Sequence, residues 1–201
     1  MDPDLTIVLL GKTGVGKSAS GNTILGQAAF ESKSSLQPVT TRIFEVTGQV
    51  FWKQISVIDT PGILGSEELI KTYCQELQQS YRPHLFLVVF SIRWFSEENQ
   101  KAVEAAVRVL GPQSFRKSYL LFTGVNTLND RPLDDCIREG DGGPLQNAVE
   151  RFERRYHQFN NQSAGREQVR ELLEKSGHLR SLQQLSSPGT RFTYTVFSDS
   201  Q

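Results

Sequence analysis

A glycine-rich loop near the N-terminus places the strongest constraint on how this chain can fold. Residues 11–18 read GKTGVGKS and directly follow the apolar run Leu5–Leu10. This order satisfies the pattern G-x-x-x-x-G-K-[S/T], whose glycines let consecutive backbone N–H groups turn around phosphate oxygens. A helix beginning near Gly16 would add the positive end of its dipole. The loop therefore predicts a nucleoside triphosphate site.

The residue types within this loop indicate separate tasks. Lys17 would reach the β and γ phosphates, while the Ser18 hydroxyl would bind Mg²⁺, a hard cation that prefers oxygen ligands. The predicted nucleotide contacts of the loop are Gly11, Thr13, Gly14, Val15, Gly16, Lys17, Ser18 and Ala19.

A second motif, Asp59-Thr60-Pro61-Gly62, follows the apolar stretch Ile55–Ile58. An acidic residue at the end of a strand beside the phosphate loop holds the metal in such proteins, and Asp59 is the candidate here. Gly62 lacks a side chain, so its N–H could approach a γ phosphate closely. Read alone, the motif could be an ordinary turn, but together with the phosphate loop it favours a GTPase switch over a kinase or a transport ATPase.

Composition narrows the class of partner. Lys and Arg total 22, as do Asp and Glu, so no net charge attracts nucleic acid or an anionic membrane. Cys74 and Cys136 lack metal-ligand spacing, and a nucleotide site belongs to a reducing compartment, so we expect free thiols in the cytoplasm. The longest apolar run, Leu85–Phe90, has six residues and is too short to span a membrane. We expect no membrane segment, with any recruitment to membranes through partners or segments outside this chain.

Apolar runs alternate with amphipathic stretches, which indicates an α/β sheet with helices on both faces. The expected strands are 5–10, 42–46, 50–58, 85–90, 118–122 and 192–197, with a turn over 46–50 that makes one pair antiparallel. The expected helices are 17–25, 67–80, 97–110, 144–159 and 166–184. The polar segments 30–41 and 62–66 would be switch loops. Ser186-Ser187-Pro188-Gly189 predicts the end of a domain spanning 1–185, with 186–201 as a tail.

Several further motifs carry a resemblance that covers residues 5 to about 180. The phosphate loop continues as SASGNTILG over 18–26, and the other matches are residues 30–32, 39–40, 59–62, 82–84, 133–135 and 155–161. In these residues the chain resembles the GIMAP family, immunity-associated GTPases related to the chloroplast import GTPases and septins. The resemblance implies a P-loop NTPase G domain with one antiparallel strand and a C-terminal helical extension over 166–184. It also implies GTP and GDP as ligands, Mg²⁺ as cofactor, and homodimers that form face to face across the nucleotide.

The family register places Thr40 where the threonine of the first switch loop completes the Mg²⁺ shell near the reacting phosphate. Thr41 is a close rival, and a solvated loop threonine is the alternative.

Base recognition departs from the family pattern. An aspartate that accepts hydrogen bonds from guanine closes an Arg-Lys-x-Asp string in the family, whereas Phe122-Thr123 is followed here by Gly124 to Thr127. Thr127 offers only a neutral acceptor, so guanine selection would weaken. Two alternatives remain open: Asp130 enters from the next turn, or Asn160 recognises the base together with backbone groups. Thr123 and Asn160 complete the predicted nucleotide contacts. A site relaxed toward ATP or xanthine nucleotides is a further possibility.

Catalysis also departs from the common pattern. Ile63 and Leu64 follow Gly62, and neither can polarise water, so hydrolysis by a single chain should be slow. The resemblance implies an arginine after the fourth strand that reaches across a dimer, and Arg93 lies one or two places early for that role. A solvated surface charge is the alternative for Arg93. The sequence thus predicts a guanine-nucleotide switch with slow or dimer-stimulated hydrolysis, or alternatively a scaffold that holds nucleotide without turnover.

Overall fold

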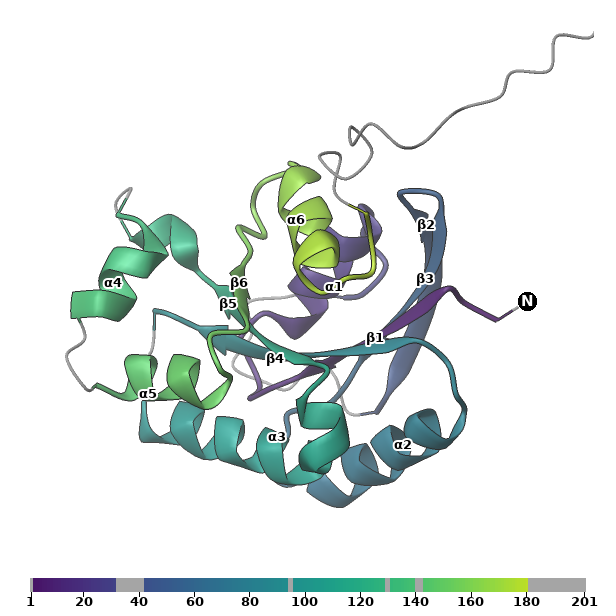
Figure 1. Ribbon diagram of the computed structural model, residues 1–201, viewed down its shortest axis with the longest axis horizontal. Helices are drawn as coiled ribbons and strands as arrows, with labels where there is room; N and C mark the ends of the chain where they lie inside the picture. Colours follow the sequence, from purple (N-terminus) through teal and green to yellow (C-terminus); the bar gives the residue numbers. More distant parts are fainter. Residues whose placement is uncertain (1, 32–41, 94–95, 129–130, 140–142, 181–201) are drawn as a thin grey trace, which may run out of the picture.

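Six strands form a single sheet in the computed structural model, which describes residues 2–31, 42–93, 96–128, 131–139 and 143–180. The strands are β1 (Leu5–Leu10), β2 (Phe44–Val50), β3 (Lys53–Asp59), β4 (His84–Ser91), β5 (Ser118–Thr123) and β6 (Tyr156–Gln158). Their spatial order is β2-β3-β1-β4-β5-β6, and only the pairing of β2 with β3 is antiparallel (Figure 1). The predicted mostly parallel sheet with one antiparallel strand is confirmed.

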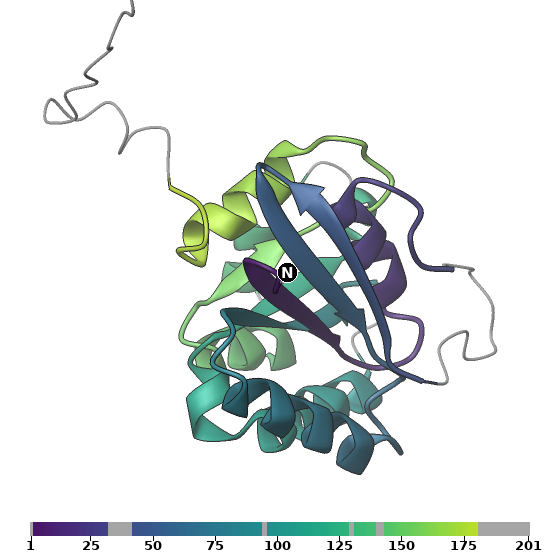
Figure 2. The same cartoon turned by 90° about the vertical axis from the view of Figure 1, so that its right-hand side faces the viewer.

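Helices cover both faces of the sheet (Figures 1 and 2). One face carries α1 (Lys17–Leu25) and α6 (Glu167–Lys175), and the other carries α2 (Glu67–Gln79), α3 (Glu97–Phe115), α4 (Leu133–Glu139) and α5 (Pro144–Arg151). A short 3₁₀ turn, η1 (Val125–Thr127), follows β5. Among the described residues, no helix combines the length and apolar character needed to cross a bilayer.

The central strand β1 explains the two hydrophobic cores. All six of its residues are buried, and alternate side chains point to opposite faces. Val8 and Leu10 join the core under α2, α3 and α5, while Ile7 and Leu9 join the core under α1 and α6. A strand covered on both faces reads as a continuous apolar run, which is why its position was predictable.

The β2–β3 hairpin differs from the prediction of a turn at residues 46–50. Gly48 lies within β2, where a Cβ would meet Leu25 Cδ2 at 3.2 Å, so a glycine suits this close approach to α1. The chain turns instead at Phe51 and Trp52, which have φ of 45° and 67°. The Arg170 guanidinium lies 4.5 Å from the centre of the Phe51 ring, a contact that supports this turn. The glycine thus lies where α1 approaches β2, and the turn is formed by two aromatic residues.

The sixth strand also differs from the prediction. A helix was expected to continue to Phe159, but α5 ends at Arg151, and Glu153 and Arg154 adopt left-handed conformations before β6. Packing decides this segment, because His157 is buried under α6 and Phe159 N–H donates to Phe122 O. The strand expected at 192–197 lies outside the described residues, and the short helix α4 was not predicted.

Helix α3 begins and bends where the sequence indicates. Ser96 Oγ accepts a hydrogen bond from Asn99 N–H, as its capping role predicts. The helix was expected to stop at Gly111-Pro112, and the backbone leaves helical geometry at Gly111 before one more helical turn to Phe115.

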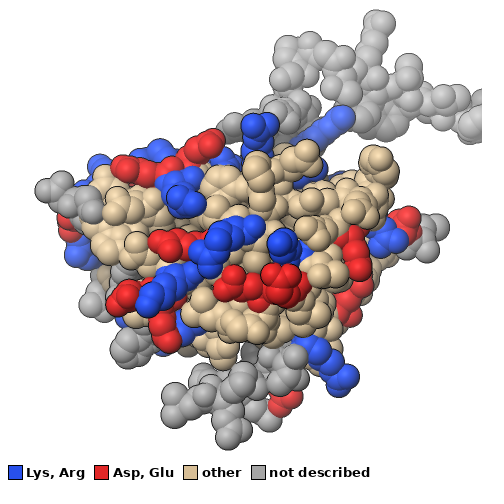
Figure 3. All heavy atoms as spheres, turned by 90° about the horizontal axis from the view of Figure 1, so that it is seen from below, with Lys and Arg blue, Asp and Glu red and all other residues tan. Residues whose placement is uncertain are grey.

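On the face formed by α2, α3 and α5, charges of both signs interleave (Figure 3). Lys101 and Glu97 form one such pair at 2.9 Å.

The carboxyl ends of the parallel strands meet at one edge. Leu9 pairs with Asp59, Leu10 with Val88, and Ser91 with Thr123. Open α/β sheets bind ligands at this edge, so the loops that leave β1, β3, β4 and β5 define the region in which a site should form.

Candidate functional site

The phosphate loop lies between β1 and α1 at this edge. Gly16 is the N-cap of α1 with φ of 96°, so Lys17 and Ser18 begin the helix. Gly11 and Val15 are buried, whereas Thr13 and Gly14 are exposed at the crest of the loop. The exposed crest and the N-terminus of a nine-residue helix create a surface of N–H donors suited to anionic oxygens.

The Lys17 ammonium group folds back over the loop. Its Nζ donates to Lys12 O at 2.9 Å and to Gly11 O at 3.2 Å, and only 7% of the residue is exposed. Burial lowers the Lys17 pKa to about 8, while the nearby Asp59 carboxylate acts in the opposite direction. Two neutral carbonyls compensate this buried cation only in part, so an anionic ligand at the loop would stabilise it.

Two of the three predicted magnesium ligands, Ser18 and Asp59, are in direct contact. Ser18 Oγ donates to Asp59 Oδ2 at 2.6 Å, and Asp59 is buried at the end of β3. The next residue fixes this end of the strand, because the Thr60 hydroxyl donates to Leu9 O at 2.6 Å. A hydroxyl and a carboxylate held together beside a phosphate loop match the oxygen ligands that Mg²⁺ prefers.

Gly62 lies directly over the phosphate loop. A Cβ at this position would overlap Thr13 Oγ1 and lie 3.0 Å from Thr13 N, so only glycine fits. Ile63 N–H donates to Gly11 O at 3.0 Å and joins the segment after β3 to the start of the loop. The sequence motifs at 11–18 and 59–62 thus form one continuous surface.

The loop after β5 borders the phosphate loop on its other side. Thr123 is buried, and its hydroxyl donates to Val15 O at 2.6 Å. Beyond it, the exposed Thr127 donates its hydroxyl proton to Gly124 O at 2.6 Å and closes the η1 turn. Asn126 Nδ2 donates to Gln162 Oε1 at 2.9 Å and links this loop to the one after β6.

Two adjacent asparagines follow β6, and their side chains differ in their contacts. Asn160 Oδ1 accepts from Gln162 N–H at 3.1 Å, which closes a local turn. Asn161 bridges to α1: its Oδ1 accepts from Thr23 Oγ1 at 2.8 Å, and its Nδ2 donates to Ser20 Oγ at 3.1 Å. Asn161 was not predicted as a site residue, and the Asn-Asn doublet at 160–161 is the sequence signal that points to it.

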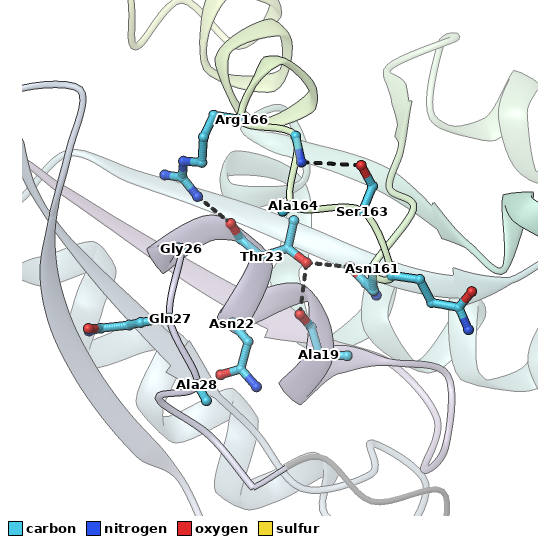
Figure 4. Close-up of a pocket in the computed structure, with 12 residues that line it drawn as sticks. Ala19, Asn22, Thr23, Gly26, Gln27, Ala28, Asn161, Ser163, Ala164 and Arg166 are labelled. Carbon is cyan, nitrogen blue, oxygen red and sulfur yellow. Dashed lines mark hydrogen bonds between the residues drawn. The ribbon is translucent and has the colours of Figure 1, made fainter.

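A cavity of about 380 Å³ lies between α1 and the loop over residues 161–166 (Figure 4). Ala19 and Thr23 line it from the helix, and Asn161 lines it from the loop. Arg166 closes it at the far end, because its guanidinium donates to Thr23 O at 2.6 Å and to Ile24 O at 2.9 Å. The cavity thus begins beside the phosphate loop and ends at the C-terminus of α1.

Of the other predicted site residues, some are described by the structure and some are not. Arg93 is exposed in the turn after β4, and its side chain lies over Gly124 on the same edge of the sheet. Thr40 lies outside the described residues, as do Thr41 and Asp130. The structure brings together the phosphate-loop residues with Asp59, Gly62 and Thr123, and it places Asn160 in the loop that borders them.

Comparison with known proteins identifies the family of this chain. A family model described as the AIG1 family matches residues 5–201. The GTPase IMAP family member 8 of Rattus norvegicus is 35% identical over 193 residues, which cover 94% of this chain and 28% of that protein. The immune-associated nucleotide-binding protein 9 of Arabidopsis thaliana is 30% identical over 191 residues, which cover 86% of this chain and 54% of the relative. The chain thus spans between about a quarter and about half of the length of these relatives.

Solved structures show a similar fold. The crystal structure of Toc33 from Arabidopsis thaliana in complex with GDP and Mg²⁺ matches with a TM-score of 0.63 and 19% identity, covering 88% of this chain and 86% of that one. A second Toc33 crystal structure matches with a TM-score of 0.65 at the same identity. The match to the family model, together with the sheet order and the phosphate loop, leads to one conclusion: the chain belongs to the AIG1 family and has a P-loop GTPase fold.

Proposed function

We propose that this chain is a guanine-nucleotide-binding switch that holds GTP or GDP with Mg²⁺ at the phosphate loop. The observation that supports this most directly is the 2.6 Å contact between Ser18 and Asp59 beside the buried Lys17 ammonium group. The relatives are named GTPases or nucleotide-binding proteins, and two of the matched Toc33 structures are complexes with Mg²⁺ and either GDP or GMPPNP. Both observations favour a guanine nucleotide with a divalent cation.

In this proposal each part of the site has a defined contact. Backbone N–H groups from Gly11 to Ala19 surround the phosphates, and Lys17 exchanges its two carbonyl partners for phosphate oxygens. Gly62 packs over Thr13 of the phosphate loop, and its N–H would donate to a γ phosphate. Thr123 fixes the loop from the base side, and Asn160 borders the base.

The residues present fit a magnesium ion. The Ser18 hydroxyl and the Asp59 carboxylate would hold it, and the proposal keeps Thr40 as the third protein ligand. When bound, the ion would neutralise negative charge on the β and γ phosphate oxygens. Ser18 and Asp59 are already adjacent, so binding needs little rearrangement of β3 or α1. Cys74 and Cys136 are free thiols, which suits action in the reducing cytoplasm.

We further propose that the triphosphate state associates as a homodimer and that hydrolysis is slow or stimulated by the dimer. Ile63, the residue after Gly62, is fully buried and cannot orient a water molecule. The arginine-finger role is assigned to Arg93, which is exposed on the same edge as the phosphate loop. For one matched structure, dimerization is described as important for the GTPase activity of atToc33 and psToc159. This supports hydrolysis that is stimulated by a dimer in the present chain.

A second candidate is a scaffold that holds nucleotide without turnover. The buried Ile63 favours it, because the described part of the site offers no side chain at this position to activate water.

Single-turnover GTP hydrolysis, measured over a range of protein concentrations, distinguishes the two candidates. A dimer-stimulated enzyme accelerates with concentration, and sedimentation with a non-hydrolysable GTP analogue should show a dimer that GDP does not support. A scaffold gives no concentration-dependent hydrolysis. Nucleotide-dependent dimerization that persists in Lys17→Ala, at nucleotide concentrations where that variant binds none, would argue against the switch.

A further inference from the structure

Gly124 follows β5 and has no side chain, and the Arg93 side chain lies against it. Gly124 has φ of +75° and carries no side chain into the region next to the phosphate loop. A Cβ at Gly124 would lie 3.1 Å from Arg93 Cγ, 3.4 Å from Arg93 Nε and 3.5 Å from Arg93 Cδ. The Arg93 side chain therefore lies beside the place where a larger side chain at position 124 would extend.

The backbone holds Arg93 in this position. Ser91 pairs with Thr123 in the β4–β5 ladder, and Ile92 N–H donates to Thr123 O at 3.1 Å. Arg93 thus leaves the sheet directly beside Gly124. Among the residues that the structure describes, Arg93 forms no ion pair, so no carboxylate there competes for its guanidinium.

The other polar side chains of this region are already engaged. Thr127 donates its hydroxyl proton to Gly124 O, and Asn126 donates its amide to Gln162. Asn160 Oδ1 accepts from Gln162 N–H. No carboxylate in the described part of the two loops can accept hydrogen bonds from the N1–H and the exocyclic amine of guanine.

We infer that Arg93 reads the base of the nucleotide bound by its own chain, donating hydrogen bonds to the O6 and N7 edge of guanine. This inference rests on the proposed function and names the chemistry of base selection within it. Guanine presents two acceptors on that edge, whereas adenine presents an amine donor at position 6. A guanidinium has only donors in a planar fork, so it matches guanine and opposes adenine.

The same geometry defines a nucleotide class and not guanine alone. Hypoxanthine, the base of inosine, has the O6 and N7 acceptors of guanine and lacks only the exocyclic amine. Arg93 would read O6 and N7 in both bases, and the described residues of the two loops supply no carboxylate that would favour the amine. The expected ligands are therefore 6-oxopurine nucleotides.

Affinities for GDP, IDP and ADP with Mg²⁺ test this inference, measured at protein concentrations where sedimentation shows a monomer. The wild-type chain should bind GDP and IDP within about threefold of each other and ADP about tenfold to a hundredfold more weakly. Arg93→Ala should lose most of that preference for both 6-oxopurines and leave ADP affinity unchanged. Arg82→Ala, which removes an arginine at the opposite end of β4, is the matched control and should change none of the three.

A second variant tests the position of the guanidinium. In Gly124→Ala the added methyl would lie 3.1 Å from Arg93 Cγ and push it aside by a few tenths of an ångström, and φ of +75° adds backbone strain, so the preference should fall toward that of Arg93→Ala. The double variant should lose no more than either single one. Thermal unfolding checks that Gly124→Ala is folded, and the exposed Arg93 supplies the variant least able to disturb folding.

Two results would overturn the inference, and a third would overturn the proposed function on which it rests. The preference of Arg93→Ala for GDP over ADP could stay as in the wild type. Alternatively, Arg93→Ala could weaken all three nucleotides equally, which would indicate general attraction or stacking. Binding of none of the three by the wild-type chain would instead overturn the proposed function itself.

Discussion

The Ser18 hydroxyl donates a 2.6 Å hydrogen bond to Asp59 Oδ2 and joins the first turn of α1 to the end of β3. The two residues are separated by 41 positions in the sequence. Their contact unites the phosphate loop and the DTPG motif in one site.

Ser18→Ala should remove the magnesium dependence of nucleotide affinity. In the wild-type chain, chelation of Mg²⁺ should weaken GDP binding about tenfold to a hundredfold, because ligands around a metal have effects of that size. Ser18→Ala should bind GDP weakly with or without chelator. Titration with a fluorescent GDP analogue measures this, and Thr72→Ala, which removes an exposed hydroxyl on α2, should behave as the wild type. An undiminished magnesium effect in Ser18→Ala would rule out its role as a ligand.

Gly62→Ala should disturb the loop through a steric effect. The new methyl would overlap Thr13 Oγ1, so the chain after β3 must move away from the phosphate loop. We expect affinity for a GTP analogue to fall about tenfold while GDP affinity changes less, because Gly62 serves only the γ phosphate. Leu64→Ala, which shortens a partly exposed side chain in the same segment, is the control. Equal losses for both nucleotides in Gly62→Ala would contradict a γ-phosphate role.

Thr127→Asp should restore reading of the guanine amine. A carboxylate at this position can accept from N1–H and from the exocyclic amine, and inosine nucleotides lack the second of these donors. The variant should therefore favour GDP over IDP by about tenfold, whereas the wild-type chain should not distinguish them strongly. Competition binding of GDP against IDP measures the ratio. An unchanged ratio would show that residue 127 does not face the base.

Stability below neutral pH should depend on His157. Burial lowers its pKa from 6.5 to about 4, and the Lys175 ammonium group adds to this, while the hydrogen bond to Gln168 O acts in the opposite direction. Between these values the unfolded chain takes up a proton that the folded chain does not. The free energy of unfolding should therefore fall by about 1.4 kcal/mol per pH unit on acidification from 6.5 to 4, about 3 kcal/mol in total.

Urea unfolding of the wild type and of His157→Gln measures this contribution. The difference between the two should shrink or reverse as the pH falls from 6.5 to 4 and then become constant. Comparing the two proteins removes the contributions of His84 and His178, whose pKa values burial also lowers. A difference independent of pH would show that His157 is not held neutral by the fold.

The sequence predicts those parts of the fold in which local pattern and packing agree. β1 is apolar throughout and buried on both faces, and Ser96 is both a capping residue and the observed cap of α3. Packing between distant segments decides the other cases. Gly48 lies in a strand where α1 approaches closely, and residues 156–158 become a strand because β5 offers them an edge.

The candidate site divides in the same way. Fixed spacing within each of the two motifs is enough to select Lys17, Ser18, Asp59 and Gly62 as candidates. The bridge from Asn161 to Thr23 and the position of Arg93 over Gly124 join residues from distant parts of the chain, so no local pattern reveals them. Arg93 was predicted as a residue that acts across a dimer, and its position over Gly124 adds a role within its own chain.

Calorimetric titration with GDP in the presence of Mg²⁺ shows whether the phosphate loop binds a guanine nucleotide. The wild-type chain should bind one GDP per chain with a saturable heat. Lys17→Ala, which removes the ammonium group from the phosphate loop, should give no heat at the same concentrations, and Lys101→Ala on the exposed face of α3 should titrate as the wild type. The absence of heat for the wild type, or equal affinities of the wild type and Lys17→Ala, would contradict nucleotide binding at the phosphate loop.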